Sequence, residues 1–122
     1  MILVDTSVWV DHLQRGNTHL ARHLSRCAVL VHPFVLGELA LGNLRQRTQV
    51  LEALSQLPMA TAATDSEVLE FIARQSLFGR GIGYVDAHLL AAVRLTSGSW
   101  LWTLDQRLQA AASSLELAWM SG

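Results

Sequence analysis

Four acidic residues each stand as the only acid of an otherwise apolar segment. They are Asp5, Glu38, Asp86 and Asp105. An ionised carboxylate is rarely placed among apolar neighbours unless a hydrogen-bond donor or a cation compensates its charge. Asp5 and Asp105 directly follow apolar runs, and Asp86 lies where a helix is expected to begin. These positions make the four acids the candidates for chemistry.

Carboxylates that converge would repel one another or bind a cation. Two of them about 4 Å apart repel by roughly 4 kcal/mol at an effective dielectric constant of 20, which raises their pKa values or attracts a metal ion. Oxygen ligands without clustered His or Cys favour Mg²⁺ or Mn²⁺ over zinc. Such an ion can orient a water molecule for attack on phosphorus and neutralise the developing charge. The residue types therefore indicate metal-dependent phosphoryl chemistry.

Each acid also has a purely structural interpretation when it is taken singly. Asp5 and Asp105 suit helix caps or turns. Glu38 suits a partly exposed helix position, and Asp86 suits a first helical turn, where the helix dipole favours negative charge. Spacing alone leaves both interpretations open.

The elements that must position these acids alternate between short apolar runs and longer helical patterns. The expected strands are Ile2–Val4, Ala28–Val31 and Trp100–Thr103, with weaker candidates at Met59–Ala62 and Leu115–Met120. Strands separated by helices need crossover connections, which suit parallel pairing. We therefore predict an α/β/α sandwich around a parallel sheet of four or five strands, with the site at the carboxyl ends of the strands.

Local signals mark where several helices begin. The expected signals are Thr6 or Ser7, Asn17, Pro33 and Thr64. Thr64 and Glu67 have the spacing of a capping box, in which each side chain satisfies a free backbone N–H of the other residue.

Composition narrows the class of protein. The chain has 122 residues, nine Arg and no Lys against ten acids, and a net charge of −1, which argues against a strongly basic nucleic-acid binder. Hydrophobic residues make up 51% and charged residues 16%, so we expect a packed domain rather than disorder. One Cys and no long apolar run predict a cytoplasmic protein without a membrane span or signal peptide.

Four blocks of sequence resemble the PIN-domain ribonucleases, and most closely the VapC toxins of toxin–antitoxin pairs. The blocks are ILVDTSVWVD, FVLGELALG, GRGIGYVDAHLLAAV and WLWTLDQRL. They cover nearly the whole chain, in the order and at the spacing that the family uses. The resemblance implies a single PIN-like nuclease domain over residues 1–122.

The resemblance also implies the site and its reaction. In this family four acids surround one or two Mg²⁺ or Mn²⁺ ions and cleave single-stranded RNA. Carried over, the catalytic and metal-binding residues are Asp5, Glu38, Asp86 and Asp105, with supporting hydroxyls on Ser7 and Thr103. Asp5 and Asp86 would be the main metal ligands. With metal-activated water as the nucleophile, the products would carry 5′-phosphate and 3′-hydroxyl ends.

Partners follow from the same resemblance. The chain would be the toxin of a type II toxin–antitoxin system, with RNA as its substrate, a VapB-like antitoxin as its inhibitor and a second copy as its homodimer partner. Arg80, in the glycine-rich loop before Asp86, is the best candidate for a substrate contact; the arginines of the early helices suit either a solvated surface or contact with RNA phosphates.

Two other classes of protein also carry acidic pockets on α/β folds. A phosphoacceptor receiver domain needs a Lys, which the chain lacks. A non-catalytic PIN-like module, whose acidic pocket binds only a basic partner, remains the alternative.

Overall fold

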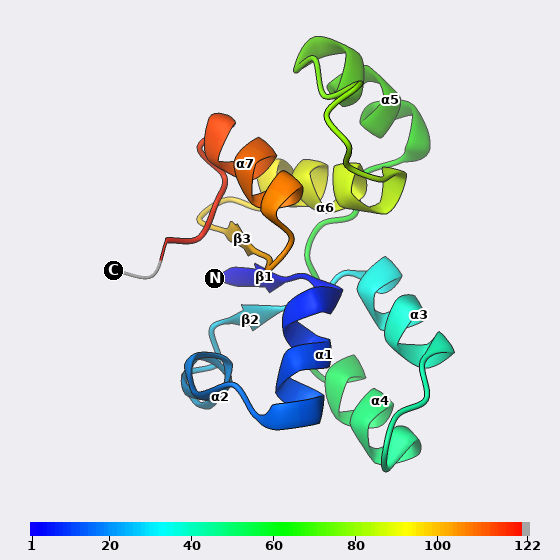
Figure 1. The fold of residues 1–122 in the computed structure, drawn as a ribbon, viewed down its shortest axis with the longest axis vertical. Helices are drawn as coiled ribbons and strands as arrows, with labels where there is room; N and C mark the ends of the chain where they lie inside the picture. The colour runs from blue at the N-terminus through cyan, green and yellow to red at the C-terminus, as the bar shows by residue number, and fades with distance from the viewer. Residues whose placement is uncertain (121–122) are drawn as a thin grey trace.

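A computed structural model describes residues 1–120, and its centre is a small parallel sheet (Figure 1). The strands are β1 (Ile2–Val4), β2 (Val29–Leu30) and β3 (Trp100–Trp102), in the order β2-β1-β3. Ile2 of β1 is in register with Val29 on one side and with Trp100 on the other. The predicted parallel sheet is therefore confirmed, with β1 in the middle.

The sheet has three strands within the described residues, where the sequence predicted four or five. The two weaker candidates form only isolated parallel bridges, between Met59 and Val31 and between Ala118 and Leu101. Each bridge rests on one pair of backbone hydrogen bonds, 2.9 Å long at Val31 and 2.7 Å long at Leu101. These segments lie at the two sheet edges but do not continue the ladder, so they do not count as strands.

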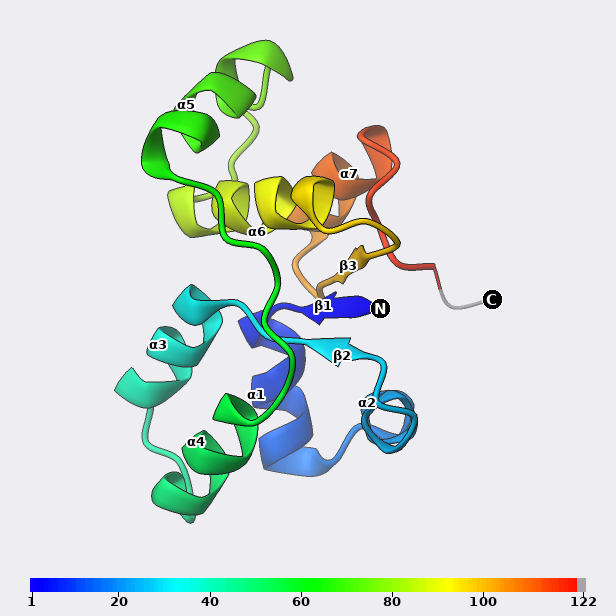
Figure 2. The ribbon, with the colours of Figure 1, turned by 180° about the vertical axis from the view of Figure 1, so that it is seen from behind.

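Seven helices flank the sheet in the described chain. They are α1 (Thr6–Arg15), α2 (Thr18–Ser25), α3 (Pro33–Leu41), α4 (Arg47–Ser55), α5 (Asp65–Arg74), α6 (Tyr84–Leu95) and α7 (Gln106–Ser114). Figures 1 and 2 show α1 to α4 on one side of the sheet and α5 to α7 on the other, with α6 between α5 and the strands. This arrangement is consistent with the predicted α/β/α sandwich. In residues 1–120, no helix has both the length and the apolar character that crossing a bilayer requires.

Most of the predicted helix starts are confirmed. The Asn17 side chain accepts the Leu20 N–H at 3.0 Å, and Pro33 occupies the first turn of α3. Thr64 and Glu67 form the capping box in both directions.

The prediction that Thr6 or Ser7 caps the first helix is wrong. The residue at the cap position of α1 is Asp5, and its side chain makes no capping bond. The Thr6 and Ser7 hydroxyls instead bind other side chains, Glu38 and Asp5 respectively.

Helix α6 lies deepest in the protein. Its residues from Ala87 to Val93 are all buried, including Leu89 and Leu90 at 0% exposure. Because the middle of α6 is covered on every side, its packing fixes the helix relative to the sheet. The first turn of this helix carries Asp86.

Candidate active site

Asp5 lies directly after β1 and is 7% exposed. One of its carboxylate oxygens, Oδ2, accepts two hydroxyl hydrogen bonds, from Ser7 and from Thr103, each 2.7 Å long. Its backbone N–H donates to the carbonyl of Trp102 at 2.9 Å. Because β1 and β3 are neighbouring parallel strands, their carboxyl ends bring Asp5 and Thr103 to one edge of the sheet.

The same two hydroxyls also hold the turn that follows β3. Ser7 Oγ accepts the Leu104 N–H at 3.0 Å, and Thr103 Oγ1 accepts the Asp105 N–H at 3.0 Å. Asp105 then caps α7 by accepting the Leu108 N–H at 2.9 Å. The Asp5 carboxylate and the Asp105 turn are therefore parts of one hydrogen-bonded network.

Asp86 is fixed by its own helix. Its Oδ2 accepts the backbone N–H of Gly83 at 2.9 Å. Burial raises the pKa of Asp86 above its usual value, and the Gly83 bond opposes that rise. The negative charges of Asp5, Asp105 and Glu38 add to the rise in pKa, in that order of size. The other three predicted acids therefore all lie near enough to Asp86 to act on it electrostatically.

Glu38 approaches from α3. Its Oε1 accepts the Thr6 hydroxyl at 2.6 Å, although the two residues are 32 positions apart. Glu38 and Asp105 are exposed, whereas Asp5 is buried and Asp86 is intermediate. The site thus has a buried side and a solvent-facing side.

The donor chemistry fits a hard divalent ion, because the four acids offer oxygen ligands only. Their spacing is wider than a ligand shell needs: within residues 1–120, no three His, Cys, Asp or Glu side chains lie close enough together to hold a metal ion. The exposed Glu38 and Asp105 side chains would have to turn inward to share an ion with Asp5.

Arg80 binds a side chain of α7. Its Nη1 donates to Ser114 Oγ at 3.0 Å, near the carboxyl end of α7. Asp105 lies at the opposite end of this nine-residue helix, which is about 14 Å long. This bond uses one of the guanidinium nitrogens of Arg80, and the substrate contact of Arg80 stays a prediction.

Sequence reasoning missed the two groups that orient Glu38 and Asp86. The first is the Thr6 hydroxyl and the second is the Gly83 backbone N–H. Thr6 directly follows Asp5, so its position was a usable signal, but its partner is far away in the sequence. The Gly83 bond has the three-residue spacing of an acidic side chain that reaches back to a helix cap.

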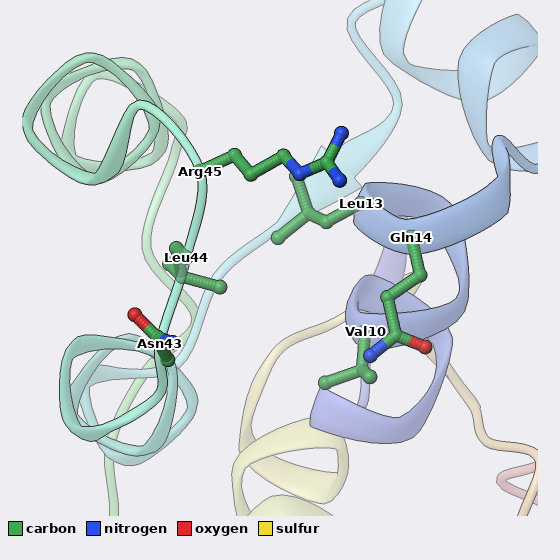
Figure 3. Close-up of a pocket in the computed structure, with 6 residues that line it drawn as sticks. All are labelled: Val10, Leu13, Gln14, Asn43, Leu44 and Arg45. Atoms are coloured by element: carbon green, nitrogen blue, oxygen red, sulfur yellow. The ribbon is translucent and has the colours of Figure 1, made fainter.

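A separate pocket of about 320 Å³ lies between α1 and residues 43–45, which connect α3 and α4 (Figure 3). Its lining residues are Val10, Leu13, Gln14, Asn43, Leu44 and Arg45. None of the four acids is among them, so this pocket is not the candidate active site.

Comparison with known proteins agrees with the fold. Residues 2–113 match the PIN domain family. The chain is 46% identical over 118 residues to Ribonuclease VapC32 of Mycobacterium tuberculosis strain CDC 1551 / Oshkosh, covering 97% of this chain and 95% of the relative. The protein of the same name from strain ATCC 25618 / H37Rv matches with the same identity and coverage. The chain therefore belongs to the PIN-domain family, in its VapC-type branch.

Proposed function

We propose that this protein is a metal-dependent endoribonuclease, the toxin of a type II toxin–antitoxin system. The observation that carries the proposal is the Asp5 network at the carboxyl end of β1, in which two hydroxyls hold one buried carboxylate beside three other acids. The identity to a ribonuclease over nearly the whole chain supports it. The non-catalytic alternative gains no support from that relative.

Asp5 and Asp86 are the proposed main ligands of Mg²⁺ or Mn²⁺, and Glu38 and Asp105 complete the set. When bound, the ion would supply positive charge to the scissile phosphate and make a water molecule a better nucleophile. Three carboxylates whose charges add to the raised pKa of a fourth, Asp86, make a favourable environment for a divalent cation.

The chain's own residues fix where these ligands lie. Ser7 and Thr103 occupy Oδ2 of Asp5, and within residues 1–120 no hydrogen bond reaches its Oδ1. The Gly83 N–H similarly fixes Oδ2 of Asp86. Each carboxylate is thus held through one oxygen, which leaves the other for a ligand.

Water is the nucleophile in this proposal, so the ribose 2′-hydroxyl takes no part. The products carry 5′-phosphate and 3′-hydroxyl ends. Products that carry 2′,3′-cyclic phosphate would contradict the proposal.

The decisive experiment replaces Asp5 by asparagine and measures cleavage of cellular RNA with added Mn²⁺, with and without EDTA. We expect D5N to fold and to lose cleavage, and EDTA to abolish cleavage by the unchanged protein. The matched control is Asp11→Asn, because Asp11 lies on the same helix but forms an ion pair with Arg15 away from the site. Full cleavage by folded D5N would refute the assignment.

Two protein partners are proposed, a VapB-like antitoxin and a second copy of this chain. An arginine from the antitoxin could replace the metal's charge, because a guanidinium forms paired hydrogen bonds with carboxylates. We also propose that residues 1–122 form one nuclease domain that works in the cytoplasm; residues 121–122 lie outside the part of the chain that the structure describes.

A further inference from the structure

Residues 77–84, between α5 and α6, present two aromatic rings to solvent. Phe78 is 68% exposed and Tyr84 is 43% exposed. Both rings line a pocket of about 200 Å³. The other lining residues are Ile72, Leu77, Gly79, Ile82, Gly83 and Ala87. Large apolar side chains left in water are informative, because folding normally buries them.

The Tyr84 ring is held rigidly. Its hydroxyl donates to Asp65 Oδ1 at 2.6 Å, and its ring meets His88 edge to face, with centroids 4.6 Å apart and planes at 88°. His88 is itself buried and lies 3.0 Å from the same Asp65 oxygen. A ring fixed in this way can receive a flat ligand without losing side-chain freedom.

The pocket and the candidate active site share one residue, Gly83. Gly83 lines the pocket, and its backbone N–H is the donor that fixes Asp86. A ligand in this pocket would therefore lie one residue contact away from Asp86, a proposed metal ligand.

A positively charged side chain from α7 packs against the same loop. Gly81 has a φ of +77°, and a Cβ added there would lie 2.7 Å from Nη1 of Arg107. The Arg107 side chain therefore packs on the loop backbone at Gly81, where the positive φ favours glycine. Arg107 is in the first turn of α7, where the helix dipole disfavours positive charge. No salt bridge to it is present within residues 1–120.

We propose that residues 77–84 and Arg107 bind one nucleotide of single-stranded RNA next to the cleaved bond. The base stacks on Phe78 and Tyr84, and Arg107 contacts a neighbouring phosphate. Aromatic stacking with a nearby cation is how proteins hold unpaired bases. The inference rests on the proposed ribonuclease function and adds a subsite to it.

The test uses D5N protein, which is expected not to cleave, and a fluorescein-labelled single-stranded RNA. Fluorescence anisotropy gives the affinity over a series of salt concentrations. The added variants are Phe78→Leu, Phe78→Tyr and Arg107→Gln, with Leu69→Ala and Arg74→Gln as controls. Leu69 is a 61% exposed apolar residue of α5, and Arg74 is an exposed arginine paired with Glu70.

We expect F78L to weaken binding by about 5- to 100-fold, in line with the loss of one stacked base, without changing the salt dependence. F78Y should retain binding, because its ring still stacks. R107Q should weaken binding and make the slope of log K against log salt shallower by about 0.7, the value for one phosphate contact to a single strand. Both controls should stay within twofold of D5N.

Different failures separate the two proposals. If D5N binds RNA and both F78L and R107Q stay within twofold of it, the subsite is refuted while the ribonuclease function stands. If F78L instead weakens self-association in analytical ultracentrifugation and leaves RNA affinity unchanged, the rings form a protein contact and the inference is again refuted. If D5N binds too weakly to measure, the same variants in the cleaving protein decide: a rise in KM for F78L and R107Q supports the subsite, and unchanged kinetics refute it. Absence of both binding and cleavage by the unchanged protein would refute the proposed function itself.

Discussion

Replacing Thr103 by valine removes one hydroxyl from the centre of the site and nearly preserves the shape of the side chain. Thr103 is 5% exposed, and its Oγ1 donates to Asp5 Oδ2 at 2.7 Å. The same oxygen accepts the Asp105 N–H at 3.0 Å. The variant therefore deletes one bond to a charged group and one bond to a backbone donor.

The expected cost follows from these two bonds. A hydrogen bond to a charged group contributes about 1.5–3 kcal/mol, and a neutral one about 0.5–1.5 kcal/mol. Asp105 is exposed, so water can replace the acceptor of its N–H, and Ser7 still donates to Asp5. We therefore expect T103V to lower the free energy of unfolding by about 2–3 kcal/mol, which is roughly 10 °C in Tm for a domain of this size.

Thr96→Val is the matched control. Thr96 Oγ1 accepts one hydrogen bond, from the Thr61 N–H at 3.0 Å, and contacts no carboxylate. Its loss should cost about 1 kcal/mol.

Urea unfolding in EDTA measures the free energy of unfolding of both variants. RNA cleavage should fall about 10- to 100-fold in T103V, because a metal ligand loses its orienting partner, and stay unchanged in T96V. A T103V protein that is as stable and as active as T96V would refute the role given to the Asp5 network.

Three further predictions concern the ionisable side chains of Asp86, His32 and Glu38. Folding raises the pKa of the Asp86 carboxyl above 3.8, so the folded protein binds the carboxyl proton more tightly than the unfolded chain does. The free energy of unfolding of the metal-free protein should therefore fall as the pH rises from 3.8 through the raised pKa. D86N should flatten this dependence in urea titrations, and an unchanged slope would contradict the assignment. Burial lowers the pKa of His32 to about 4, so the NMR shifts of its ring nitrogens should not change near pH 6.5. The free energy of unfolding should decrease as the pH falls from 6.5 towards 4. A titration of His32 near pH 6.5 would show that the ring is hydrated. Thr6→Val removes the hydroxyl that binds the exposed Glu38 carboxylate. The Mn²⁺ concentration needed for half-maximal cleavage should then rise up to about tenfold, with little change in the free energy of unfolding. An unchanged Mn²⁺ dependence would mean that Glu38 needs no orientation by Thr6.

Local sequence signals were enough to predict most of the fold. The cap at Asn17, the proline at the start of α3 and the capping box at Thr64 depend on neighbours only a few residues away. The central strands are short apolar runs whose parallel pairing follows from the helices between them. The sheet edges were less predictable, because a single bridge and a full strand begin from the same kind of apolar run.

The sequence by itself determined which acids are exceptional, since an isolated carboxylate in an apolar segment can be recognised without coordinates. Only the tertiary structure decided which atoms meet. Thr103 binds Asp5 across 98 positions, and Arg80 binds Ser114 across 34 positions. It also decided that Arg107 lies on Gly81. Such contacts depend on how separate strands and helices pack together, and no local spacing in the chain encodes that packing.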